Sequence, residues 1–118
     1  MPGFSRSEAG RAVWASRILT NAAGQRIIKV ERVSTIGPEN SITQKVNAKG
    51  GVDRNYCDDS GRQFKQISNH DHGHKKESAF GNHGEHAHDY TWSDDGKPER
   101  SMARELSPKE RKENSDIL

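Results

Sequence analysis

Residues 52 to 68 read VDRNYCDDSGRQFKQIS, and this stretch decides the fold class. It contains two runs of strand-forming residues, Val52–Cys57 and Arg62–Ser68, on either side of the turn sequence Asp-Asp-Ser-Gly. Two such runs joined by a short turn with glycine are typical of a β-hairpin. We expect one packed face of this hairpin to be formed by Val52, Asn55 and Tyr56 against Phe64 and Ile67.

Further strand-forming runs precede this hairpin. The segments Val13–Thr20 and Gln25–Ser34 are separated by Asn-Ala-Ala-Gly, which predicts a hairpin with Gly24 at a positive φ. A helix beginning at Ser7 is an alternative for the first segment, but its glycine and its β-branched residues favour a strand. After a Gly-Pro pair, Ser41–Asn47 is expected to form another short strand.

A long polar loop and one more extended segment follow the central hairpin. Asn69–Gly84 contains three glycines and no hydrophobic period, and loops of this length within small domains are usually functional or disordered. His86–Trp92 resumes an extended pattern and ends at the turn Ser93–Gly96. At strand spacing, Tyr90 and Trp92 are expected to be core residues.

The C-terminus carries a helix signal. Ser107 is a capping residue, Pro108 fits the first helical position, and Glu110 completes a capping box. The segment Lys109–Ser115 is almost entirely charged and has no apolar stripe. We therefore expect a short solvated helix or a tail, held by Leu106, Ile117 and Leu118.

These segments together predict a small, sheet-dominated α+β fold of mostly antiparallel hairpins, with a polar histidine-rich loop and a short C-terminal helix. The expected organisation is an N-terminal arm (1–12), one β-rich domain (13–106) with the histidine-rich loop (69–88), and a charged C-terminal helix or tail (107–118). Only 18 of the 118 residues are Leu, Ile, Val or Phe, but the net charge of +2 lacks the imbalance typical of disorder. A thin core is therefore expected.

The sequence also argues against two classes of protein. It has no apolar run long enough to cross a bilayer and no classical export signal, which predicts a cytoplasmic protein without a membrane partner. Its single cysteine, Cys57, excludes a scaffold held by internal disulfides. Neighbouring carboxylates disfavour the thiolate of Cys57, so we interpret it as a strand residue and not as a nucleophile.

All six histidines lie between His70 and His88, and this clustering is the strongest feature of the sequence. In a strand, residues two apart point to the same side, so His86 and His88 are expected to share a face while Ala87 and Asp89 take the other. A loop that brings His72 opposite this pair would complete a site. Protonating all six histidines would raise the formal charge from +2 to +8.

One chemistry that fits the cluster is acid–base cleavage of RNA. Attack by a ribose 2′-hydroxyl needs a base, an acid and a cation for the phosphate, and histidine titrates in the range required for the first two. His86 and His88 are the candidate base and acid, and the basic N-terminal segment would help to hold the substrate. Supporting residues are His72 in the loop, Lys65, Lys75 or Lys76 at the phosphate, and Asp89 or Tyr90 orienting an imidazole or a nucleotide. This chemistry needs no cofactor.

The second chemistry is divalent-metal binding, with zinc as the leading cofactor. Neutral imidazoles suit zinc, copper, nickel or iron, and carboxylates can ligate or orient them. The candidate ligands are His72, His86, His88 and Asp71, with Glu85 or Asp89 in support. The spacing matches neither His-Glu-x-x-His nor Cys-x-x-Cys. A third interpretation is a solvated polar loop whose histidines have no joint role.

Residues 51–118 also resemble a known kind of sequence, through five short motifs: Arg-Asn-Tyr (54–56), Lys-Gln-Ile-Ser-Asn (65–69), Asp-His-Gly (71–73), Gly-Glu-His-Ala-His-Asp-Tyr (84–90) and Arg-Glu-Leu (104–106). They resemble an uncharacterised C-terminal cassette of Gram-positive prophage head-morphogenesis (minor head) proteins. Such tails are similar to the exchangeable toxin domains of polymorphic toxin systems, many of which are small ribonucleases.

The resemblance implies a smaller site than six histidines would suggest. It supports Asp71, His72, His86, His88, Asp89 and Tyr90, and it requires no histidine at 70, 74 or 83. It implies phage head proteins or an immunity protein as partners besides RNA, and a virion-associated location if the chain is part of a head protein. The chain is expected to be either a free-standing form of the cassette or the tail of a larger protein.

Overall fold

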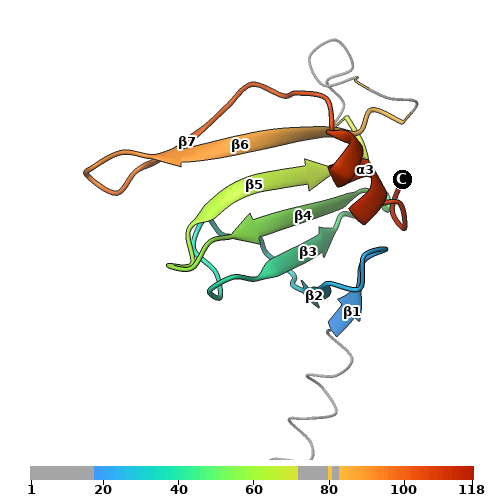
Figure 1. The fold of residues 1–118 in the computed structure, drawn as a ribbon, viewed down its shortest axis with the longest axis horizontal. Helices are drawn as coiled ribbons and strands as arrows, with labels where there is room; N and C mark the ends of the chain where they lie inside the picture. Colours follow the sequence, from blue (N-terminus) through green and yellow to red (C-terminus); the bar gives the residue numbers. More distant parts are fainter. Residues whose placement is uncertain (1–17, 72–79, 81–82) are drawn as a thin grey trace, which may run out of the picture.

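A computed structural model describes residues 18–71, 80 and 83–118. Seven strands form one sheet in which spatial order follows sequence order (Figure 1). The strands are β1 (Ile18–Thr20), β2 (Arg26–Lys29), β3 (Ile42–Val46), β4 (Val52–Cys57), β5 (Gln63–Ser68), β6 (His86–Trp92) and β7 (Pro98–Arg100), and the helix α3 (Pro108–Glu113) follows them. The expected sheet-dominated α+β fold is confirmed.

The hairpin at 52–68 forms as the sequence predicts. Strands β4 and β5 pair antiparallel, with Asp53 opposite Ser68 and a register irregularity after Tyr56. Gly61 closes the turn at φ 83°. The expected packed face is partly wrong, because Tyr56 and Ile67 belong to the hydrophobic core whereas Asn55, one position away, points to the other surface of the sheet.

One strand pair departs from the hairpin pattern. The turn before β2 has Gly24 at φ 79°, as expected, but β2 ends at Lys29 and pairs with β3 in parallel. The chain between them crosses to the start of β5, where Ile36 bridges Arg62, and then returns beside β2. A crossing segment of this kind reverses the chain before β3, which makes the pair parallel. The part of the expected first strand at 13–17 lies outside the described residues.

The two surfaces of the sheet have different characters. The core cluster lies on the surface that faces α3, which we call the helix face, and comprises Ile27, Ile42, Tyr56, Ile67, Ala87 and Leu106. The opposite surface carries His86, His88, Asn55 and Ser68, all of them buried, and we call it the histidine face. The thin core expected from composition therefore lies on the helix face of the sheet only, among the described residues.

Helix α3 has the predicted capping box, since the Ser107 hydroxyl accepts from the backbone N–H of Glu110 and the Glu110 carboxylate accepts from the backbone N–H of Ser107. The expected short helix is present and Leu106 before it belongs to the core cluster, but the helix is not solvated on all sides. Glu110 and Asn114 are buried against the sheet, and Arg111 pairs with Glu85 at 3.1 Å. Polar contacts attach α3 because its sequence offers no apolar stripe.

Strand β7 was not predicted, because Pro98–Arg100 is short and polar. The turn before it has Gly96 at φ 80°, and the hairpin pairs Tyr90 with Arg100 and Trp92 with Pro98. Beyond β7 the chain still follows β6 to a bridge between Ala87 and Arg104, one residue out of register with the hairpin. This extra residue is a β-bulge directly beside His88.

The fold also shows how far Cys57, Tyr90 and Trp92 match the expectations from the sequence. Cys57 is a buried free thiol on β4, and burial is the main factor that raises its pKa, with Asp58 adding to it. Tyr90 and Trp92 are only partly buried and do not belong to the core cluster. Within the described residues, no helix is long and apolar enough to cross a membrane.

Candidate functional site

The histidine face is built around two rings that β6 places side by side. The ring centroids of His86 and His88 are 5.0 Å apart and the ring planes are nearly perpendicular, at 88°. This arrangement follows from strand geometry, because residues two apart along a strand point to the same side. The predicted juxtaposition of His86 and His88 is therefore what the structure shows.

Backbone carbonyls fix the orientation of both rings. Nδ1 of His86 donates to the carbonyl oxygen of Gly84 at 3.0 Å, and Nδ1 of His88 donates to that of Ser101 at 2.9 Å. A carbonyl only accepts hydrogen bonds, so in each neutral ring the lone pair is on Nε2. The Ser101 acceptor is available because the bulge redirects the edge segment at this position.

The two histidines differ in their access to solvent. His86 is 0% exposed, whereas His88 is 7% exposed and reaches the surface. Burial lowers the pKa of His88, and the positive charge of Arg100 and the neighbouring His86 lower it further, although the Ser101 hydrogen bond and Asp89 act in the opposite direction. His88 is therefore a neutral imidazole at pH 7, the protonation state that a general base requires.

A polar row extends from His86 across the neighbouring strands. Ser68 on β5 is the cross-strand partner of His86, and Asp53 on β4 is the partner of Ser68. The Ser68 hydroxyl donates to Asp53 Oδ1 at 2.5 Å, and His70 Nε2 lies 3.2 Å from the same oxygen. Sequence reasoning did not single out Asp53 and Ser68, because only the strand register brings them beside the histidines.

Along β6, the face continues from His88 to Tyr90 and then to β7. Arg100 is the cross-strand partner of Tyr90, so both side chains lie on the same side of the β6–β7 hairpin. Burial raises the pKa of Tyr90, whereas Arg100 lowers it. Sequence reasoning also missed Arg100. The turn at Ser93–Gly96 could have revealed it. If the residues after this turn form a strand, the turn sets the hairpin register and places Arg100 opposite Tyr90.

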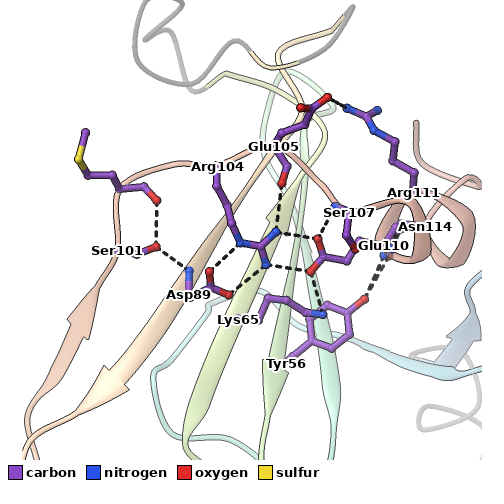
Figure 2. Close-up of polar contacts among 11 residues, drawn as sticks. Tyr56, Lys65, Asp89, Ser101, Arg104, Glu105, Ser107, Glu110, Arg111 and Asn114 are labelled. Atoms are coloured by element: carbon purple, nitrogen blue, oxygen red, sulfur yellow. Dashed lines mark hydrogen bonds and ion pairs between the residues drawn. The ribbon is translucent and has the colours of Figure 1, made fainter.

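The structure does not bring Lys65 and Asp89 to this site. They are cross-strand partners on β5 and β6, and both side chains lie on the helix face (Figure 2). Arg104 binds Asp89 through Nε and Nη2 at 2.6 and 3.0 Å, and it binds both oxygens of Glu110 at 2.8 and 2.9 Å. Lys65 reaches Glu110 at 3.1 Å. Both residues thus attach α3 to the sheet.

This ion-pair network depends on the charge of Glu110. Burial alone would raise the pKa of Glu110, but hydrogen bonds from Arg104, the Ser107 backbone and Lys65 lower it to about 2. The same contacts raise the pKa of Arg104 and lower that of Asp89. Lys65 and Asp89 therefore belong to an ion-pair network that holds α3 on the sheet. The catalytic roles expected for them from the sequence stay predictions.

Only some of the expected metal ligands lie in the part of the chain that the structure describes. His72, together with Lys75 and Lys76, lies outside the described residues. Asp71 packs against Gly84 at the start of β6, since a Cβ at Gly84 would come within 2.6 Å of the Asp71 Cβ. Within the described part of the chain, no group of three or more His, Cys, Asp or Glu side chains is arranged to hold an ion. A metal site would therefore need a ligand from elsewhere.

A comparison with protein-family models, with curated proteins and with solved structures finds no match to this chain. The function is therefore inferred from the chemistry of the histidine face.

Proposed function

We propose that this protein is a ribonuclease that cleaves RNA through the ribose 2′-hydroxyl, with His88 as the general base. The observation that carries the proposal is the setting of His88: an imidazole that is largely buried but 7% exposed, has a lowered pKa, is oriented by the Ser101 carbonyl and lies near the charge of Arg100. A neutral base near a cation suits attack on a phosphodiester.

In the proposed step, Nε2 of His88 removes the proton from the 2′-hydroxyl. The 2′ oxygen then forms a bond to phosphorus and the bond from phosphorus to the 5′ oxygen breaks, which leaves a 2′,3′-cyclic phosphate. The Tyr90 hydroxyl donates its proton to the departing 5′ oxygen, and Arg100 stabilises the charge on the phosphate and on the tyrosinate. Tyr90 and His88 are two residues apart on one face, so they can flank a single phosphate.

This assignment changes the role expected for His86. A ring that is 0% exposed does not reach a substrate in this conformation, so we propose His86 as a positioning residue for His88. The edge-to-face contact at 5.0 Å and the bond to the Gly84 carbonyl support that role. The resemblance to toxin-like tails, many of which are ribonucleases, also supports the proposal.

The experiment uses a labelled single-stranded RNA in EDTA at pH 7. We expect products with cyclic phosphate ends and no cleavage at a nucleotide that carries a 2′-deoxy sugar. His88→Ala should lower the rate by about 10²- to 10⁴-fold, the usual contribution of a positioned base. His83→Ala removes an exposed histidine away from the strand and serves as the matched control. Intact RNA, or equal cleavage by folded His88→Ala, would eliminate the proposal.

A divalent-metal site is the second candidate function. The observation in its favour is that both Nδ1 atoms donate to carbonyl oxygens, since such bonds commonly orient histidines that ligate metals through Nε2. If this site exists, Zn²⁺ added to chelator-stripped protein should raise the melting temperature at micromolar concentration. The double change of His86 and His88 to Asn should abolish that rise, and an unchanged melting temperature in the parent protein would exclude the site.

A further inference from the structure

The polar strip on β6 extends past Tyr90 to an aromatic and cationic pair. The Arg62 guanidinium carbon lies 4.8 Å from the centre of the Trp92 ring. The indole N–H of Trp92 donates to the backbone carbonyl of Gln63 at 2.9 Å, which anchors the ring to β5. Trp92 and Arg62 are both only partly buried. The ring is thus held in place and stacked with a cation at the surface.

The charged residues at the paired positions of the β6–β7 hairpin divide between its two sides. Tyr90 and Trp92 alternate with Asp89 and Thr91, and the contacts of Asp89 with Arg104 place its carboxylate on the helix face. Arg100 faces the same way as its partner Tyr90, while Glu99 pairs with Thr91 and faces away. The histidine side of this hairpin therefore presents two rings and an arginine, with the acidic residues of the paired positions on the opposite side.

We infer that the substrate is single-stranded RNA and that an unpaired base next to the scissile phosphate stacks on Trp92, an inference that rests on the proposed ribonuclease function. Aromatic rings provide stacking surfaces for bases, and arginines beside them bind the backbone. Trp92 lies one same-face step beyond Tyr90, so a strand whose phosphate is held at Arg100 passes over it. A base within a duplex is already stacked between its neighbours and is not free to make this contact.

The test measures binding separately from cleavage. A fluorescent 2′-O-methyl RNA of about ten nucleotides lacks the nucleophile, so its anisotropy reports affinity whether or not the protein cuts RNA. We expect the single strand to bind at least tenfold more tightly than the same sequence in a duplex. We also expect it to quench the emission of Trp92 in a Trp14→Phe background.

The variants separate stacking from folding. Trp92→Ala should weaken binding by about 5- to 100-fold, the range for loss of one stacked base, whereas Trp92→Phe should retain most of the affinity. Thr91→Ala, on the opposite side of the same strand, should bind like the parent protein. Equal affinity for the duplex, unchanged binding by Trp92→Ala, or no quenching would each overturn the inference. Binding as expected without any cleavage of ordinary RNA would overturn the ribonuclease proposal and leave single-strand binding established.

Discussion

The ring of His86 stands edge-on to the ring of His88, with 5.0 Å between their centroids, although only His88 reaches the surface. The ring of His86 therefore forms one wall of the position that the His88 ring occupies. Because its Nδ1 is bound to the Gly84 carbonyl at 3.0 Å, that wall has a fixed orientation. Three features determine the orientation and the pKa of His88, the proposed base. They are the His86 ring on the same strand, the bulged edge segment that supplies the Ser101 carbonyl, and the charge of Arg100.

The first prediction concerns the positioning role of His86. His86→Phe keeps a ring of similar shape and removes the bond to Gly84, so we expect kcat to fall by about tenfold with little change in KM. Because His86 also contributes to the low pKa of His88, the acid limb of the pH–rate profile should move to higher pH. A variant that loses stability but keeps the parent profile would show that His86 has only a structural role.

The second prediction concerns pH. The pKa of His88 is lowered from 6.5, so cleavage should retain its neutral base, and hence its rate, at pH values somewhat below 6.5. Arg100→Gln removes a positive charge that lowers this pKa, and the acid limb should then shift upward. The measurement is kcat/KM from pH 4.5 to 8. Lys97→Gln, an exposed lysine at the adjacent turn, is the control and should leave the limb in place.

The third prediction concerns acid stability. The pKa of Glu110 is about 2 in the folded protein and near 4.5 without its partners, so its ion pairs stabilise the fold fully above pH 4.5. That contribution, roughly 3 kcal/mol, should disappear as the pH falls from 4.5 towards 2. Glu110→Gln keeps the capping box and should reduce stability at pH 7 by about 2 kcal/mol, with a weaker dependence on acid.

Urea unfolding at several pH values measures this effect. Glu113→Gln on the same helix is the control, because Glu113 pairs with the exposed Lys109 only at 3.8 Å and should change stability by less than about 0.5 kcal/mol. Equal losses for the two variants would refute a special role for the Arg104–Glu110 pair.

The fourth prediction concerns the attachment of the C-terminus. Arg54 is fully buried and donates to Gln44, Asn114 and Asp116, the last at 2.6 Å. Arg54→Met retains much of the volume but leaves these acceptors without their donor. We expect a loss of about 3 kcal/mol in the free energy of unfolding. The exposed Arg26, changed to Met, should cost little, and a comparable loss there would contradict this interpretation.

The sequence by itself determined the features that depend on near neighbours. The hairpin at 52–68, the capping box at Ser107 and the shared face of His86 and His88 all depend on residues within one turn or one strand. Turn residues fix local backbone angles, and strand alternation fixes which side chains point the same way. No information about distant segments is needed for these features.

Only the tertiary structure decided which distant residues meet. Arg104 joins Asp89 to Glu110 because the chain after β7 returns along β6, and Arg100 reaches Tyr90 because a short polar strand pairs there. The row from His86 through Ser68 to Asp53 depends on the register of three strands. A shift of one residue in any of them would turn these side chains to the other surface. That register is set by the whole sheet and its one-sided core, which is why local pattern did not reveal it.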